Sequence, residues 1–164
     1  MFPSESIQVL ENTPSRVVIL DPPNYAFGTY MLVLGACGAA IAIFLLYRRS
    51  LLPLGWMLML IGFLLGVFGF YLLTNKRVIT LSRSEGTLKI EKSAWGATRL
   101  QAMVPLNTIQ RATVETVKYS RILMVVMRSG ESYALGDGSN RQGYYGAENA
   151  INGFLGVAVA PSAQ

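Results

Sequence analysis

Two long apolar runs near the N-terminus constrain this chain more than any other feature of its sequence. The runs Tyr25–Tyr47 and Leu54–Leu73 contain no Asp, Glu, Lys or Arg, and only a short basic loop, Arg48–Pro53, separates them. A helix needs roughly 20 apolar residues to cross a hydrocarbon core about 30 Å thick, and each run has that length. No strand or core helix of a soluble domain needs two such runs in succession. The sequence therefore predicts two transmembrane helices that form an antiparallel hairpin.

Small residues recur at the same spacing in both runs. They are Gly28, Gly35, Ala39 and Ala42 in the first run and Gly55, Gly62, Gly66 and Gly69 in the second. At about 100° per residue, these positions share one narrow face of each helix. Small residues let helix backbones approach closely in lipid. Two interpretations follow: the two faces pack against each other, or one face docks onto a larger membrane complex.

The charged residues that flank the two runs predict an orientation. The loop between the runs holds Arg48 and Arg49, whereas the outer flanks hold Arg16, Lys76, Arg77, Arg83, Lys89 and Lys92. The positive-inside rule therefore places both termini in the cytoplasm, which for a bacterial protein means the inner (cytoplasmic) membrane. Residues 1–24 lack the apolar core of a secretory signal, so we expect the first run to stay in the mature protein.

The rest of the chain predicts short β-strands and one helix. The strands are expected at 7–10, 16–20, 77–81, 87–92, 99–105, 109–116, 121–127 and 132–135, and an amphipathic helix at about 142–155 is ended by Gly156. The expected fold is a membrane helical hairpin (25–74) and a mainly β domain (75–156), a bent sheet or small barrel with a capping helix. Residues 1–24 form a β-hairpin segment and 157–164 a tail. Pairing of residues 1–20 with the later sheet is left open.

Missing residue types exclude most catalytic chemistry. The sequence contains no histidine, and its single cysteine, Cys37, lies inside the first apolar run. A histidine base, a cysteine nucleophile outside the membrane and a His/Cys metal cluster are therefore excluded. The glycine-rich stretch 136–143 lacks the Lys-Ser/Thr ending of a phosphate-binding loop. We expect no catalytic, cofactor-binding or metal-binding residues and no cofactor, and the lack of an aromatic stacking platform argues against nucleic acid.

Two groups of residues outside the runs are candidates for binding. The first is basic and is interpreted either as a lipid-headgroup contact or as the positive flank of a topogenic signal; it comprises Lys76, Arg77, Arg83, Lys89, Lys92 and Arg99. The second is aromatic, Trp95, Tyr144 and Tyr145. These three are interpreted either as partner contacts or as core and rim residues.

Four segments carry a resemblance to a known family. Segments 80–88, 104–109, 123–131 and 147–155 resemble bacterial membrane proteins with a pleckstrin-homology-like domain. The layout of two N-terminal spans before a β domain is similar, more loosely, to the photosystem I assembly factor family. The resemblance implies a pleckstrin-homology-like fold for the β domain, and it supplies no catalytic motif and no lipid-binding pattern.

These observations favour a non-enzymatic function. We expect an accessory, assembly or stabilising subunit of a larger integral membrane complex, anchored among membrane lipids by its two helices and contacting partners through the β domain. The alternative is a stand-alone module that binds the membrane surface or anionic lipids. A third hypothesis, an enzyme or transporter, would have to rely on Lys, Tyr, Ser or carboxylate groups, or on oligomerisation to build a pathway.

Overall fold

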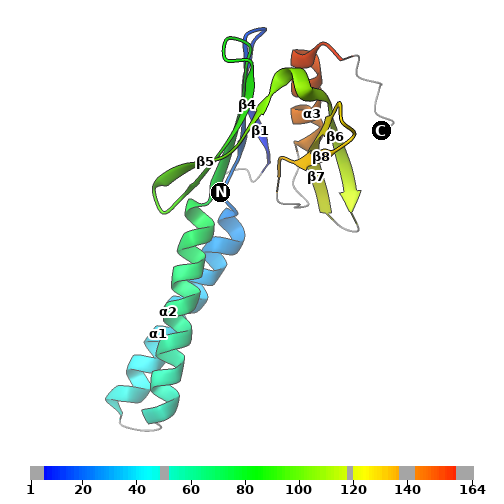
Figure 1. Cartoon of the computed structure of the whole chain (residues 1–164). Coiled ribbons are helices and arrows are strands. Elements are labelled where there is room, and N and C mark those ends of the chain that lie inside the picture. The colour runs from blue at the N-terminus through cyan, green and yellow to red at the C-terminus, as the bar shows by residue number, and fades with distance from the viewer. Residues whose placement is uncertain (1–5, 49–51, 118–119, 137–142, 158–164) are drawn as a thin grey trace. The chain divides into compact units, whose positions relative to one another are not determined.

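The structure, a computed structural model, describes residues 6–48, 52–117, 120–136 and 143–157 (Figure 1). Arg49 of the basic loop, most of the glycine-rich stretch 136–143 and the tail 158–164 lie outside the described residues. The chain divides into two compact units. A helical unit contains residues 23–75 and the turn 94–96, and a β unit contains the rest of the described chain.

The helical unit is a hairpin of two equally long helices. Helix α1 (Tyr25–Tyr47) and helix α2 (Leu52–Thr74) each have 23 residues. Asn24 caps α1, because its side-chain oxygen accepts a hydrogen bond of 3.1 Å from the Phe27 amide. The two apolar runs of the sequence thus form two helices, as predicted, and α2 extends beyond the expected bounds at both ends.

Glycine and alanine form the contact between the helices. The buried residues are Gly28, Gly35 and Ala42 of α1 and Gly55, Gly62 and Gly69 of α2. They recur every seventh residue, the repeat that keeps one seam of each helix against its partner in a left-handed pair. The two small-residue faces therefore pack against each other, as the first interpretation predicts.

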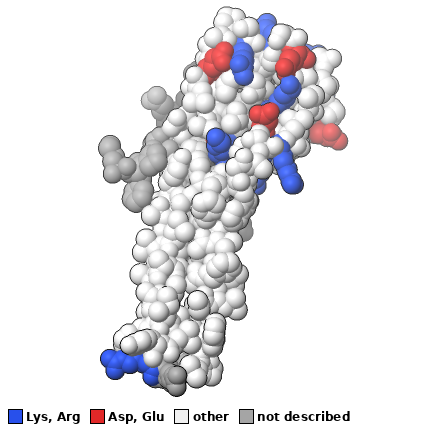
Figure 2. Space-filling view, turned by 90° about the vertical axis from the view of Figure 1, so that its left-hand side faces the viewer, with Lys and Arg blue, Asp and Glu red and all other residues white. Residues whose placement is uncertain are grey.

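The outer surface of this hairpin is apolar. Large side chains such as Phe63 and Leu60 are exposed (66% and 60%). On the face that Figure 2 shows, no Lys, Arg, Asp or Glu lies along the helices. Both helices are long and apolar enough to cross a membrane, with a mean hydropathy of 2.2 over the best window of each.

The N-terminal segment belongs to the β unit. Strands β1 (Gln8–Asn12), β2 (Arg16–Asp21), β3 (Lys76–Ser82), β4 (Thr87–Ala94) and β5 (Ala97–Pro105) form one antiparallel sheet in the order β1-β2-β3-β4-β5. Strand β2 pairs with β3 along its whole length, and Asp21 lies opposite Arg77. The question left open by the sequence is answered: the first two strands join the later sheet, and the helical hairpin is an insertion between β2 and β3.

The remaining strands form a second sheet. Strands β6 (Ile109–Val117), β7 (Ser120–Met127) and β8 (Ser132–Ala134) pair in that order, all antiparallel. Pro105, which has no backbone N–H, ends β5, and a 3-10 turn (Leu106–Thr108) follows before β6 begins. The break explains why the β unit has two antiparallel sheets and not the single bent sheet or barrel that the sequence predicts.

Helix α3 (Tyr144–Leu155) covers the core between the sheets. It begins two residues later than predicted, after Gly143, which has a positive φ of 95°. A side chain there would overlap the Ile7 carbonyl. Gly156 ends the helix with φ 74°, as predicted. The fully buried core side chains include Val17, Ile19, Leu81, Leu123, Leu135 and Ile151.

Candidate functional site

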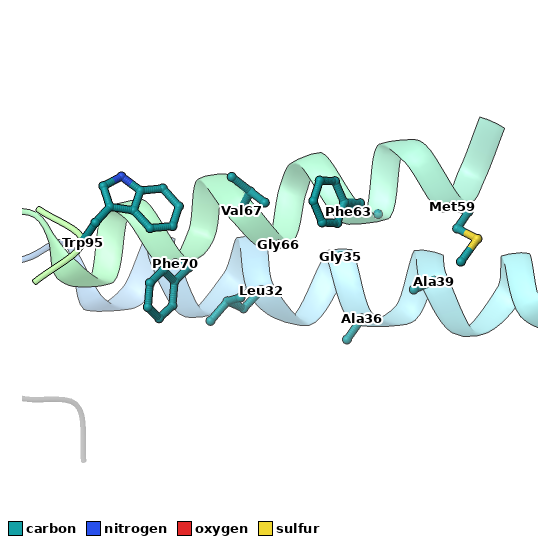
Figure 3. A pocket seen from close by; sticks show the side chains of 11 residues that line it. Leu32, Gly35, Ala36, Ala39, Met59, Phe63, Gly66, Val67, Phe70 and Trp95 are labelled. Atoms are coloured by element: carbon teal, nitrogen blue, oxygen red, sulfur yellow. The ribbon is translucent and has the colours of Figure 1, made fainter. Parts of the chain in front are cut away.

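An apolar groove runs along one face of the helical hairpin. Its volume is about 520 Å³. Small residues of both helices form its floor, and larger apolar side chains form its walls (Figure 3). The floor consists of Gly35, Ala36, Ala39, Gly62 and Gly66, and the walls of Leu32, Met59, Phe63, Val67, Phe70 and Trp95. With no charged residue in its lining, the groove is suited to an apolar occupant.

Two glycines of the groove floor have different surroundings. A Cβ on Gly62 would lie 2.8 Å from the Gly35 carbonyl oxygen and 3.0 Å from the Ala39 nitrogen, so the backbone of α1 blocks any side chain there. A Cβ on Gly66 would meet nothing within 4 Å. Gly62 therefore serves the contact between the helices, whereas the side-chain position of Gly66 opens into space. Sequence reasoning placed both on one face and did not separate them.

The turn between β4 and β5 closes one end of the groove. It consists of Trp95 and Gly96, whose φ angles are 57° and 77°. The Trp95 ring lies 5.3 Å from the Phe70 ring and 6.2 Å from the Tyr71 ring, measured between centroids. The Trp95 amide donates a 3.3 Å hydrogen bond to the Thr74 hydroxyl. The turn is thus fastened to the last turn of α2.

Strand β5 forms one edge of the five-stranded sheet and exposes apolar side chains on both of its faces. Leu100 and Met103 are 53% and 51% exposed, and their odd spacing places them on opposite faces of the strand. An edge strand in water normally carries polar or charged residues at such positions. Sequence reasoning assigned this strand but did not identify it as an edge, because no local pattern shows that its side away from β4 has no partner strand.

Three of the six basic candidates bind groups within the β unit. The Arg77 guanidinium donates a 2.9 Å hydrogen bond to the Leu135 carbonyl. Arg83 donates one of 2.7 Å to the Phe154 carbonyl at the end of α3, and its guanidinium lies 5.0 Å from the centre of the Phe154 ring. Both arginines therefore stabilise the β unit without any headgroup, and the contact of Arg83 is favourable also because a cation lies at a helix C-terminus.

Lys89, the third, forms a 2.7 Å ion pair with Glu85. This pair holds the pKa of the Glu85 carboxyl below its usual range, first through the hydrogen bond and then through the charge of Lys89. Lys76, Lys92 and Arg99 form no ion pair with any residue that the structure describes.

The three aromatic candidates differ in their exposure and belong to different units. Tyr144 is 1% exposed and lies in the core, where its ring packs beside Gly136. Tyr145, its neighbour on α3, is 45% exposed, and the Arg121 guanidinium lies 5.4 Å from its ring centre. Trp95 is 54% exposed in the helical unit. Burial therefore leaves Trp95 and Tyr145, and not Tyr144, with surface available for a partner.

A polar hollow of about 340 Å³ lies on the outer side of β2, β3 and β4. Its lining combines hydroxyls with two cations and two carboxylates: Thr80, Ser82, Ser84, Arg16, Lys89, Glu85 and Glu91. The opposite charges are balanced, and Lys89 already pairs with Glu85. Such a lining gives no preference for an anionic or a cationic ligand.

Acidic and metal-binding groups are scattered. No group of three or more His, Cys, Asp or Glu side chains able to hold a metal occurs among the residues that the structure describes. No family model matches the chain, and no curated protein matches it. The surfaces described above are therefore the basis for an assignment of function.

Proposed function

We propose that this chain is an integral membrane protein in which α1 and α2 span the bilayer as an antiparallel hairpin. Each helix has 23 residues, and at 1.5 Å per residue it is longer than a hydrocarbon core of about 30 Å. Their exposed surface is apolar, and lipid is the solvent that suits it. The flanking Lys and Arg residues favour an orientation with both termini in the cytoplasm of a bacterial cell.

Within that membrane, the chain acts as a non-enzymatic accessory, assembly or stabilising subunit of a larger protein complex. The observation that carries this proposal is the edge strand β5, with Leu100 and Met103 exposed on opposite faces. The apolar helices require only lipid and do not imply a protein partner. An apolar edge strand in a β domain does, because main-chain groups and side chains together offer a surface that a partner can cover.

The β unit is proposed to be a pleckstrin-homology-like domain. Its two antiparallel sheets followed by one C-terminal helix support this assignment. The contacts of Arg77, Arg83 and Lys89 within the unit weaken the alternative of a stand-alone anionic-lipid module. That alternative now depends on Lys76, Lys92 and Arg99.

The test is recovery of the tagged protein from its native membrane in mild detergent, followed by a native gel and mass spectrometry of the band. We expect the protein in a large complex with stoichiometric partners. Leu100→Arg should release those partners. Leu10→Arg is the comparison variant, because Leu10 is 57% exposed on β1, the other edge of the same sheet, so the pair of variants tests which apolar edge the partner covers.

Two outcomes would contradict the proposal. One is a wild-type protein that runs alone while the complexes of the same membrane remain intact without it. The other is loss of partners in both variants or in neither, because only a loss specific to Leu100→Arg assigns the interface to β5. A protein that runs alone and binds anionic vesicles in a salt-sensitive manner would support the lipid module instead.

A further inference from the structure

The turn between β4 and β5 has a backbone that its sequence does not favour. Two strands joined by two residues with positive φ form a type I′ hairpin, a turn normally made by Asn-Gly. Here the residues are Trp95 and Gly96. Trp95 is the only residue other than glycine with positive φ in the described part of the chain. A bulky side chain in this conformation costs free energy and persists where something else holds it.

What holds Trp95 is the end of α2. Its ring packs at 47° to the Phe70 ring and at 36° to the Tyr71 ring. Its amide binds the Thr74 hydroxyl, which in turn donates to the Phe70 and Tyr71 carbonyls at 3.0 and 3.2 Å. The turn therefore adds an aromatic ring to an aromatic pair at the last turn of an apolar helix.

These contacts do not bury the ring. Trp95 remains 54% exposed and Phe70 47% exposed, and both continue the apolar wall of the groove (Figure 3). Tryptophan combines a large apolar surface with one N–H donor, and it concentrates where hydrocarbon meets headgroups. Trp95 therefore places a largely exposed apolar ring with one N–H donor at the C-terminal end of α2.

We propose that the β4–β5 turn is an interfacial membrane anchor, with the Trp95 ring inserted among lipids at the depth of Phe70 and Tyr71. The β domain is then attached to the bilayer by the turn as well as by the two chain connections to the hairpin. This inference rests on the proposed membrane insertion of α1 and α2, and it assigns lipid, not a protein partner, to Trp95.

The test uses the full chain in phosphatidylcholine vesicles and its two tryptophans, one at a time. Trp56→Phe leaves Trp95 as the only tryptophan, and Trp95→Phe leaves Trp56, which is 64% exposed near the other end of α2. We expect Trp95 emission to be blue-shifted relative to hydrated tryptophan. Lipids brominated near the headgroup end of the acyl chain should quench it more strongly than lipids brominated near the chain terminus.

Several results would overturn the anchor. Trp95 emission at the hydrated wavelength, quenched by aqueous acrylamide and not by brominated lipid, would place the ring in water. Blue-shifted emission that neither quencher affects would place it under a second copy of the chain. If lipid quenches Trp56 but not Trp95, the membrane assignment stands without the anchor. If brominated lipid quenches neither Trp56 nor Trp95, both the membrane insertion of the helices and the anchor are contradicted.

Discussion

At the scale of single residues, substitutions of Gly62 and Gly66 in the groove floor are expected to have different effects. Gly62→Ala places a Cβ against the backbone of α1, at 2.8 Å from the Gly35 oxygen, so the helices must separate. Overpacking of this kind costs about 1–3 kcal/mol. Gly66→Ala meets no atom within 4 Å and gains helix propensity, so the hairpin should stay closed.

The readout is a distance between spin labels in lipid, measured by pulsed electron paramagnetic resonance. One label is attached to Cys37, which is exposed on α1, and the other to a Leu60→Cys variant on the outer side of α2. We expect a longer or broader distance distribution for Gly62→Ala and an unchanged one for Gly66→Ala. Equal effects of the two substitutions would contradict the assigned roles.

A partly buried carboxyl, Glu148, gives a prediction for pH dependence. Loss of hydration raises the pKa of Glu148 above its ordinary value, and the nearby Arg111 charge offsets only part of that rise. A raised pKa in the folded state means that the charged form of Glu148 lowers stability above that pKa, and that the loss disappears as pH falls.

Glu148→Gln should therefore raise the thermal midpoint of the β unit at neutral pH. The difference between the two proteins should shrink as pH falls through the raised pKa and vanish below the ordinary value of 4.5. Calorimetry in a mild detergent over this pH range would check the sign. A stability gain that is the same at all pH values would show that charge is not its cause.

At the scale of elements, one side chain of α3 binds the backbone of an edge strand in the second sheet. Asn152 of α3 accepts a 2.8 Å hydrogen bond from the Ala112 amide and donates one of 3.0 Å to the Ala112 carbonyl. Its amide group thus takes the place of a neighbouring strand beside β6, an edge strand. Ala112 is 1% exposed, so without Asn152 its backbone groups are buried and unsatisfied.

Asn152→Ala should destabilise β6 by about 2–4 kcal/mol, because two buried polar groups lose their partners. Asn149→Ala is the matched control, since this residue is exposed on the same helix and alanine favours helix formation. Hydrogen exchange of β6 and β7 peptides would measure both effects. Similar exchange in the two variants would mean that water replaces Asn152.

The elements themselves were largely predictable from the sequence, and their partners were not. Alternation in Thr87–Lys92 and the apolar run of β7 identify strands, because a buried face imposes a period of two. The helices α1 and α2 are identified by a different signal, the length of their uncharged apolar runs. No local pattern shows that β5 ends a sheet or that Asn152 reaches β6, 40 residues away, because both depend on packing between distant segments.

The candidate site was predictable to the same extent. Identical small-residue spacing in both apolar runs predicted the helix contact, yet the difference between Gly62 and Gly66 depends on the crossing of the helices. The sequence indicated only a basic surface residue at Arg83, because its neighbours in the chain do not show that the end of α3 lies beside it. Trp95 was identifiable only as an aromatic in a turn, because its strained φ and its contact with Phe70 belong to the folded chain.

At the scale of the whole molecule, the helical hairpin is inserted between β2 and β3, two strands that are paired with each other in the β unit. Asp21 at the end of β2 lies directly opposite Arg77 near the start of β3. Such facing residues of an antiparallel pair are about 5 Å apart. A two-residue Asn-Gly turn is sufficient to join them. Nothing in the pairing of β2 with β3 therefore requires the helices.

Replacement of residues 22–76 by Asn-Gly should give a water-soluble β domain that unfolds cooperatively. Its matched control is the chain that starts at Arg77 and so lacks β1 and β2. That control should fail to fold, because Val17 and Ile19 are 0% exposed in the core and their removal leaves a cavity and an uncovered β3. Circular dichroism melts and the fraction of soluble protein would separate the two chains. Equal folding of both would mean that the N-terminal strands contribute little to the stability of the sheet, whereas folding of the first alone would show that the β unit is one domain with a helical hairpin inserted between two of its neighbouring strands.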